Sequence, residues 1–156
     1  MPTNDEDRLL EVLDDAECRL LLGTARIGRL GFTDGALPAI LPVPFTVGEG
    51  CVRIPARGGS RIVDAVRRSV VAFAVDSYDV ADHTGWGVTV VGPALVVPEP
   101  GPAAPGGESP GGSRGPLSGH SIVVQMGLLR GWRLSLPAGG VPRLADPGAV
   151  AALRPA

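Results

Sequence analysis

The sequence of 156 residues predicts a mainly β, antiparallel fold that curls toward a small barrel. Turn signals at Asp34-Gly35 and Gly48-Glu49-Gly50 separate short β-rich runs, a spacing typical of an antiparallel meander. The long β-branched run Trp86–Val97 is interrupted at Gly92-Pro93, where a bulge or bend fits. Since a sheet that bends at such a point tends toward closure, we expect a small barrel in preference to an open sandwich.

The N-terminal half is predicted to contain one helical segment, three strands and a short helix. Apolar residues between Asp7 and Leu22 recur at spacings of three and four, which indicates one or two amphipathic helical turns that end at Gly23. The expected elements that follow are strands at Ala25–Phe32, at Ala36–Val47 with interrupting prolines, and at Cys51–Pro55, then a helical run at Ile62–Arg68.

The C-terminal half begins with Val70–Val75, which is apolar on both faces and predicts a strand covered on each side. Asp76–Gly85 is expected to be a polar loop before the Trp86–Val97 strand. One domain, residues 1–97 and 120–136, then surrounds a flexible Pro/Gly-rich insertion at 98–119 and precedes a loose tail at 137–156. Two short strands are expected in its last part, His120–Met126 and Trp132–Leu136, joined by Gly127–Gly131.

Composition limits the possible functions. An apolar content of 44% suits one domain with a genuine core, and a net charge of -2 lacks the electrostatic footprint of a nucleic-acid-binding protein. All 14 basic residues are arginine, which excludes a lysine Schiff base. No run approaches the ~18 apolar residues of a membrane span, and the acidic N-terminus has no apolar signal core. We therefore expect a cytoplasmic protein without membrane association.

Cysteine, histidine and acidic residues show no catalytic or metal-binding spacing. Cys18 and Cys51 lie in dissimilar contexts and are expected to be two buried thiols. His83 could act as an acid or a ligand, but a solvated loop is the simpler interpretation because no second ligand lies at metal spacing. Ser60 has no neighbouring base and no Gly-x-Ser-x-Gly pattern. No metal site is predicted, and catalytic residues stay unassigned.

The segment Arg57-Gly58-Gly59-Ser60-Arg61 is the strongest candidate binding site. Two glycines allow a tight turn that brings amide N–H groups close to an anion, and the helical run that follows presents its positive dipole end there. Ser60 adds a hydroxyl, while Arg57 and Arg61 add guanidinium groups. The segment predicts a phosphate cradle, with a simple turn carrying solvated arginines as the alternative.

An ordered set of segments resembles the pyridoxamine 5'-phosphate oxidase-like family, above all its small actinobacterial members related to nitroimidazole-resistance proteins. The resemblance spans roughly residues 9–97, with a weaker echo at Ile122–Leu136. The segments that carry it are Cys18–Gly23, Ile27–Phe32, Pro38–Val43, Gly59-Ser60-Arg61, Val71–Asp76 and Trp86–Gly92.

This resemblance implies an antiparallel, Greek-key-like split β-barrel with a short N-terminal helix and one or two small helices. It also implies a homodimer that binds flavin mononucleotide (FMN) in two clefts between the subunits. The turn at Gly59-Ser60-Arg61 would hold the phosphate, and the isoalloxazine ring would lie beside strand 38–45, with the Trp86 strand nearby. The implied cofactor-binding residues are Pro42, Val43, Ala56, Arg57, Gly59, Ser60, Arg61 and Trp86.

The sequence departs from the family pattern at three places. Ile62 stands where relatives often have a lysine, so fewer cations would hold the phosphate. The Pro/Gly-rich stretch between Val97 and Ile122 replaces a common helix. Neither His120 nor Arg133 matches the set with which true pyridoxamine-phosphate oxidases hold their substrate, which disfavours the namesake reaction.

The function predicted from the sequence is that of an FMN-dependent oxidoreductase that moves electrons or hydride from a reduced nicotinamide to a small organic acceptor. Trp86 could stack on the flavin, and Trp132 could too, although an isolated tryptophan is more often a core or interface anchor. The alternatives are an F420-dependent reductase, a flavin or haem carrier with His83 or His120 as axial ligand, and a barrel without cofactor. Neither nucleic acid nor membrane is an expected partner.

Overall fold

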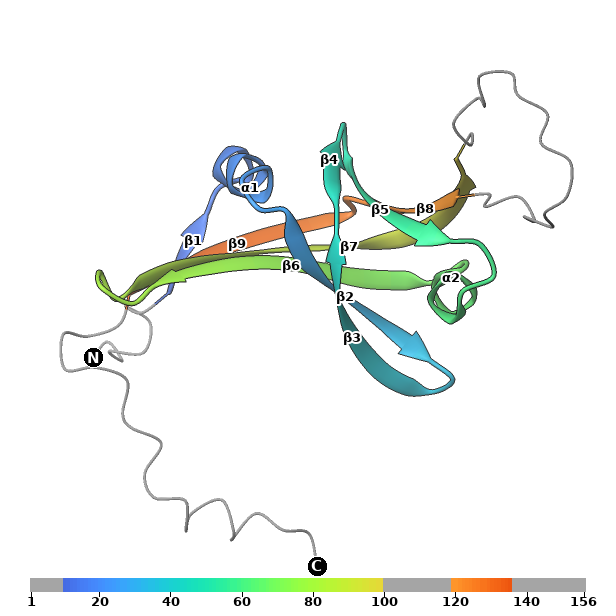
Figure 1. Cartoon of the computed structure of the whole chain (residues 1–156). Helices are drawn as coiled ribbons and strands as arrows, with labels where there is room; N and C mark the ends of the chain where they lie inside the picture. The colour runs from blue at the N-terminus through green and yellow to red at the C-terminus, as the bar shows by residue number, and fades with distance from the viewer. Residues whose placement is uncertain (1–9, 100–118, 136–156) are drawn as a thin grey trace, which may run out of the picture.

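The computed structural model describes residues 10–99 and 119–135 (Figure 1). These ranges contain nine strands and two helices, which follow the chain in a fixed order. The elements are β1 (Leu10–Leu13), α1 (Asp15–Leu22), β2 (Ile27–Asp34), β3 (Leu37–Pro44), β4 (Thr46–Gly48), β5 (Cys51–Arg57), α2 (Arg61–Val66), β6 (Val70–Asp79), β7 (Thr84–Pro98), β8 (Gly119–Gln125) and β9 (Leu128–Ser135).

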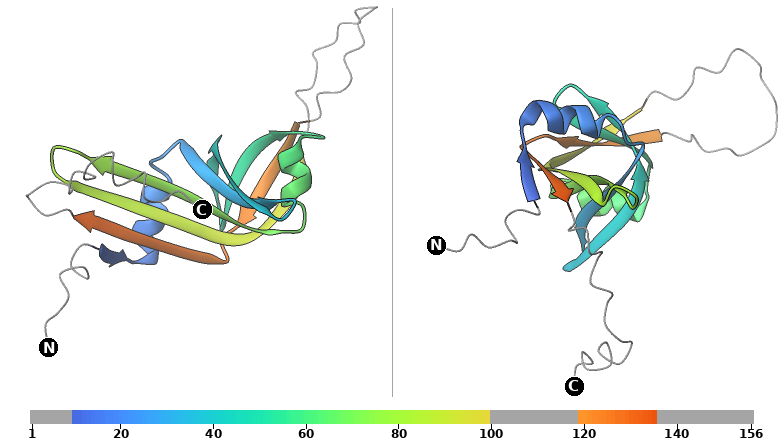
Figure 2. Two further views of the ribbon diagram at one scale, coloured as in Figure 1. Left: turned by 90° about the horizontal axis from the view of Figure 1, so that it is seen from below. Right: turned by 90° about the vertical axis from the view of Figure 1, so that its left-hand side faces the viewer.

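All strand pairs are antiparallel and form one bent sheet with the order β3-β2-β6-β7-β8-β5-β4, while β9 pairs with β7 and β1. The two end strands of this order, β3 and β4, are not hydrogen-bonded to each other, so the barrel stays open between them. Figure 2 shows the sheet curling around its interior, with the long strands β6 and β7 running from the end that holds β1 and β9 to the end that holds α2. The prediction of a mainly β split barrel is confirmed.

Strand β7 changes partners at the predicted bend. Val91 still pairs with Leu128 of β9, whereas Ala94 pairs with Val124 of β8. Gly92 lies between these two pairings and packs directly against the backbone of the β8–β9 turn. Because a single strand serves both parts of the sheet, this bend sets the angle between them.

The N-terminal segment differs from the prediction of helical turns from Asp7 onward. Within the described residues the chain begins as β1, which pairs with β9, and α1 begins only after Asp14. Asp14 caps α1 by accepting a hydrogen bond from the Glu17 N–H at 2.8 Å. Glu17 pairs with Arg133 of β9 at 3.3 Å, which holds α1 against the sheet.

Three further predictions of element bounds were wrong. The expected single strand Ala36–Val47 is divided at Phe45 into β3 and β4, which lie at opposite ends of the strand order. The expected polar loop Asp76–Gly85 is mostly strand, because β6 and β7 pair from Val70–Pro93 out to Asp79–Thr84. The expected connection Gly127–Gly131 is largely the first half of β9. In each case the backbone pairing overrides the local polarity or the glycine and proline content.

The hydrophobic core lies inside the curled sheet and extends under both helices. Its largest fully buried side chain is Phe73, whose ring packs edge-on against Phe45 with centroids 4.7 Å apart. Cys18 of α1 belongs to this core, as predicted, whereas Cys51 is only half-buried. The pKa of Cys18 is raised, mainly because burial disfavours the charged thiolate and secondly because the negative charge of Asp15 lies nearby. This thiol is therefore protonated at neutral pH.

A backbone hydrogen bond connects the two ends of the predicted insertion 98–119. β7 continues through Pro98 and β8 begins at Gly119, and the Glu99 N–H donates to the Gly119 carbonyl at 2.9 Å. Glu99 Oε1 accepts from the buried Ser121 hydroxyl at 2.5 Å and from Arg53 at 2.7 Å. The hydrogen bond from Ser121 has the larger effect and that from Arg53 the next largest, and together they hold the pKa of Glu99 below its ordinary value. The rest of the insertion and the predicted tail 137–156 lie outside the described residues.

The hairpin predicted at Asp34-Gly35 is present, and its second loop residue offers a stability test. Asp34 pairs with Leu37, so Gly35 and Ala36 form a two-residue loop with φ values of 56° and 72°. A positive φ suits glycine but strains alanine. We expect Ala36→Gly to raise the free energy of unfolding by about 0.5–1 kcal/mol, after the added entropy of the unfolded chain is subtracted.

Thermal denaturation would measure this change, with Ala39→Gly as the matched control. Ala39 is half-buried inside β3, where glycine only loses packing and adds chain entropy. The control should therefore have a lower melting temperature than the wild type, and Ala36→Gly a higher one. A lower melting temperature for both variants would contradict the proposed strain at Ala36.

Candidate functional site

The predicted phosphate cradle is a turn that joins β5 to α2. Ala56 and Arg57 are the last residues of β5 and pair with His120 and Gly119 of β8. Gly59 has a φ of +71°, and a Cβ at this position would meet nothing within 4 Å. The turn closes through a hydrogen bond from the Ser60 N–H to the Arg57 carbonyl at 3.2 Å. The backbone at Gly59 is therefore exposed to approach by a ligand.

Ser60 stands directly before α2 at its N-cap position, but its side chain makes no capping hydrogen bond. Its Oγ is buried and has no hydrogen-bond partner, which is true of no other buried side-chain oxygen or nitrogen within 10–99 and 119–135. A buried hydroxyl without a partner is costly and rare in folded proteins. Ser60 Oγ thus lies beside the exposed turn with its hydrogen-bonding capacity unused.

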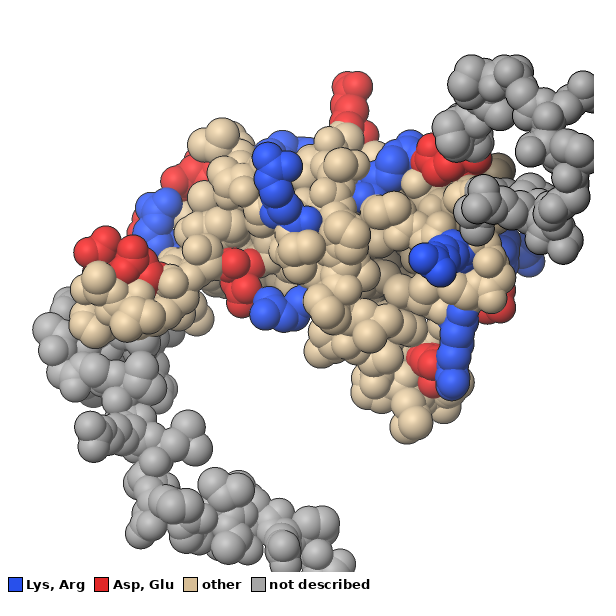
Figure 3. Space-filling model, in the orientation of Figure 1, with Lys and Arg blue, Asp and Glu red and all other residues tan. Residues whose placement is uncertain are grey.

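Two arginines flank this turn in different ways. Arg61 Nε binds Asp34 Oδ2 at 2.7 Å, an ion pair that joins α2 to the end of β2. The Arg61 side chain is still 84% exposed, so its outer nitrogens remain accessible. Arg57 is exposed and takes part in none of the ion pairs found among the described residues. On the face seen in Figure 3, basic and acidic side chains lie interspersed around this end of the molecule.

Pro42 and Val43 lie on β3, an end strand that contacts β5 without hydrogen-bonding to it. Val43 is buried in the core beside Gly28, whereas Pro42 is exposed opposite Arg29. The two side chains therefore point to opposite faces of the sheet, and only the strand's main chain could meet a ligand with both residues. β3 is linked to the start of α2 at its other end, since Arg61 pairs with Asp34, the cross-strand partner of Leu37. Pro42 lies five residues further along the strand.

Trp86 lies in the structure at a distance from the β5–α2 turn. It is the third residue of β7, where it is half-buried and packs against the core. β7 reaches the segment after α2 only at Ala94, whose N–H donates a hydrogen bond to the Ser69 carbonyl. Ala94 lies eight residues beyond Trp86, which is about 25 Å along the strand. Within one chain, Trp86 is therefore not brought together with the other predicted cofactor-binding residues.

A pocket of about 390 Å³ opens beside Trp86 on the sheet formed by β1, β6, β7 and β9. Gly87 forms part of its floor between two cross-strand partners, Asp76 of β6 and Trp132 of β9. Asp76 forms an ion pair with Arg29 at 3.0 Å. The pocket is lined by Leu10, Asp76, Ser77, Tyr78, Trp86, Gly87, Trp132 and Leu134.

The two glycines at this end of β7 have different roles. A Cβ on Gly85 would lie 2.8 Å from the Ser77 carbonyl oxygen and 2.9 Å from the Tyr78 ring, so packing requires glycine there. A Cβ on Gly87 would have no neighbour closer than 3.9 Å. Glycine weakens a strand interior and often marks a close approach by another group. Gly87, which sequence reasoning did not single out, leaves an open floor between aromatic walls.

The remaining candidates carry no catalytic arrangement. His83 lies in the β6–β7 turn with a φ of 54°, beside Asp79, whose carboxylate accepts from the backbone of Ala81 and Asp82. Within the described parts of the chain, no three His, Cys, Asp or Glu side chains are grouped to hold a metal. The helices there are also too short and too polar to cross a bilayer.

Comparisons with known proteins place this fold in a family. The sequence profile described as pyridoxamine 5'-phosphate oxidase matches residues 14–105. The uncharacterised protein Rv0080 of Mycobacterium tuberculosis (strain ATCC 25618 / H37Rv) is 41% identical over 93 residues, which cover 56% of this chain and 61% of that relative. The chain thus matches less than two thirds of that relative's length.

Two solved structures illustrate the similarity of the fold. The FAD binding protein from Mycobacterium smegmatis is 26% identical, with a TM-score of 0.62 over 80% of this chain and 98% of its own. A proposed 5-nitroimidazole antibiotic resistance protein from Bacteroides thetaiotaomicron is 11% identical, with a TM-score of 0.62 over 80% of this chain and 87% of its own. The profile matches more than half of the chain, and with this agreement in fold the protein belongs to the pyridoxamine 5'-phosphate oxidase family.

Proposed function

We propose that this protein binds a flavin nucleotide, FMN, and transfers electrons or hydride from a reduced nicotinamide to a small organic acceptor. The observation that carries the proposal is the unpartnered Ser60 hydroxyl beside the exposed Gly59 turn. A phosphate has several strong acceptor oxygens, and a small rotation of the serine side chain would let Oγ donate to one of them. The residues present therefore fit the phosphate end of a flavin nucleotide.

Guanidinium groups support the same end of the site. Arg57 has no ion-pair partner among the described residues, and Arg61 offers its outer nitrogens while Nε stays on Asp34. Arginine suits phosphate because its nitrogens can form parallel hydrogen bonds to two oxygens. Asp34 competes for Arg61, and Ile62 adds no charge, so we expect a modest affinity for the phosphate.

The ring end of the site needs a second copy of the chain. We propose that the protein forms a homodimer in which the β7 segment at Trp86 and Gly87 of one copy faces β3 and the β5–α2 turn of the other. The open floor at Gly87, between Tyr78 and Trp132, would let a flat ring approach the strand. Exposed apolar side chains on β1 and β3 support burial against a copy, among them Val12 at 76% and Ile40 at 69%.

The bound flavin would supply the redox chemistry, while the protein would position it and limit access by water. No acid or base of the described residues is needed for that role, which agrees with the lack of a catalytic cluster. FAD is the second candidate, because the Mycobacterium smegmatis relative is an FAD binding protein. The deazaflavin F420 fits less well, since its acidic tail would require more basic surface than the interspersed charges provide.

The test compares FMN with riboflavin, which lacks the phosphate, by flavin fluorescence titration of the purified protein. FMN should bind at least ~10-fold more tightly than riboflavin, and Arg61→Ala should remove most of that difference. Asp34→Asn should strengthen FMN binding because it releases Arg61 from its ion pair. Gly87→Val should weaken both ligands alike, because it fills the floor under the ring.

The control is Arg67→Ala, which removes the same charge from the C-cap of α2 and should leave both affinities unchanged. FAD, F420 and haem are titrated in parallel, and light scattering gives the oligomeric state. The phosphate cradle would be refuted if the wild type bound FMN and riboflavin with equal affinity. It would also be refuted if the Asp34→Asn variant bound FMN more weakly than the wild type does. If flavin binds, oxidation of a reduced nicotinamide with a quinone as acceptor tests the reaction itself.

A further inference from the structure

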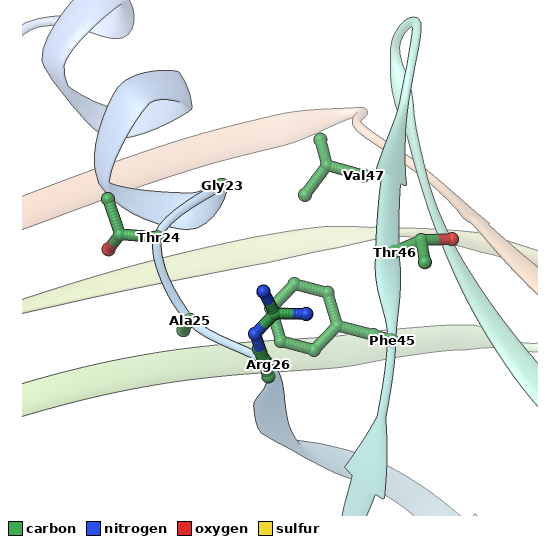
Figure 4. A pocket seen from close by; sticks show the side chains of 7 residues that line it. All are labelled: Gly23, Thr24, Ala25, Arg26, Phe45, Thr46 and Val47. Atoms are coloured by element: carbon green, nitrogen blue, oxygen red, sulfur yellow. The ribbon is translucent and has the colours of Figure 1, made fainter.

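A second pocket lies where the barrel is open, and it shares no residue with the proposed flavin site. It has a volume of about 320 Å³ and is lined by residues 23–26, which join α1 to β2, and by residues 45–47, which are the junction Phe45 and the first two residues of β4 (Figure 4). At Phe45 the chain leaves one end of the strand order and enters the other. A hydrogen bond from the Phe45 N–H to the Arg26 carbonyl at 3.3 Å links the two walls.

Arg26 is the charged residue of this pocket. Its guanidinium extends into the space between the two walls, next to the Phe45 ring in the view of Figure 4. The five ion pairs within residues 10–99 and 119–135 all involve other arginines, and no acidic residue lines the pocket. The pocket therefore carries an uncompensated positive charge, which favours an anionic ligand.

Two apolar side chains, those of Phe45 and Val47, line the pocket together with Arg26. The Phe45 ring is 7% exposed and is held in place by its edge-on contact with Phe73, so it forms a rigid wall. Val47 turns its side chain toward the same space, whereas the hydroxyls of Thr24 and Thr46 turn away from it (Figure 4). The Thr24 hydroxyl is already used, since it donates to the Leu21 carbonyl at 2.7 Å.

We propose that this pocket binds a small monocarboxylate with an apolar body, such as an aromatic or branched aliphatic acid. One guanidinium can hold a carboxylate through two parallel hydrogen bonds, while the ring of Phe45 and the side chain of Val47 contact the body of the ligand. A phosphate dianion fits less well because Arg26 is the one cationic side chain among the lining residues and would leave the second negative charge unpaired. The volume, near the lower limit of ligand pockets, restricts the ligand to a small molecule.

The test follows backbone amide signals by NMR while benzoate is added to the purified full-length chain, with benzamide as the neutral ligand of the same shape. Both titrations are done at constant ionic strength. Benzoate should shift the amides of residues 23–26 and 45–47 in a saturable way and bind at least ~10-fold more tightly than benzamide. Arg26→Gln should remove this preference.

Two further variants control the result. Arg130→Gln removes the same charge from an exposed position on β9 and should bind benzoate like the wild type. Val47→Glu places a carboxylate at the pocket wall, where Val47 is 39% exposed, and should weaken benzoate binding as Arg26→Gln does. The proposal is overturned if the wild type binds benzoate and benzamide with equal affinity, or if the Arg26→Gln variant binds benzoate as tightly as the wild type does. So do shifts confined to residues 57–61, which would place the anion at the flavin site instead.

Discussion

Replacing Gly92 by alanine is expected to lower the free energy of unfolding by more than ~4 kcal/mol, enough to prevent stable folding of a domain of this size. The added Cβ would lie 1.8 Å from the Gln125 carbonyl oxygen and 2.9 Å from its carbon. Both are backbone atoms of Gln125, the last residue of β8, so no side-chain rotation can relieve the overlap. The bend that lets β7 serve both parts of the sheet would have to open.

Urea denaturation followed by circular dichroism measures this loss, with Gly31→Ala as the matched control. Gly31 also lies in a strand, but its added Cβ would meet Ala72 at 3.6–3.8 Å, an ordinary contact. The control should change the free energy of unfolding by less than about 1 kcal/mol. If both glycine variants unfold at similar urea concentrations, Gly92 is not the constraint on the bend that its contacts indicate.

Replacing Phe73 by alanine should cost about 3–5 kcal/mol, because the largest fully buried side chain of the core would leave a cavity. Phe73 also fills the space that Gly28 leaves open, since a Cβ on Gly28 would lie 2.2 Å from Phe73 Cζ. Gly28→Ala is therefore expected to be destabilising in the wild type. The same change should be much less harmful once the Phe73 ring is removed.

A double-mutant cycle of Gly28→Ala and Phe73→Ala tests this dependence through the free energies of unfolding. We expect the double variant to be more stable than the sum of the two single losses predicts, by at least about 1 kcal/mol. Additive losses would mean that the backbone at Gly28, and not the Phe73 ring, makes alanine unfavourable. Phe73→Leu provides a milder variant if Phe73→Ala does not fold.

Local patterns were sufficient to predict most strands and the bend. The hairpin at Asp34-Gly35 and the strand Val70–Val75 follow from turn chemistry and apolar periodicity, which depend only on neighbouring residues. The division of residues 36–47 at Phe45 could not be predicted. That division is set by which distant strands β3 and β4 pair with, and periodicity carries no information on the choice of partner.

The candidate site shows the same limit. The motif at residues 57–61 identified a turn and its charged groups, because those residues are contiguous in the chain. The pairing of Arg61 with Asp34 joins residues 27 positions apart, and only the folded chain reveals it. Trp86 was grouped with the phosphate turn through family resemblance, yet within one chain it lies at the other end of the sheet.

The sequence by itself determined the mainly β class, the hairpin at residues 34–37, the bend at Gly92 and the contiguous turn at 57–61. Only the tertiary structure decided which glycine leaves an open floor, which arginines lack an ion-pair partner within the described residues and which serine hydroxyl is buried without a hydrogen bond. The physical reason is that turn and strand preferences arise between neighbours in the chain. Space, ion pairing and desolvation depend instead on atoms that folding brings together from distant segments.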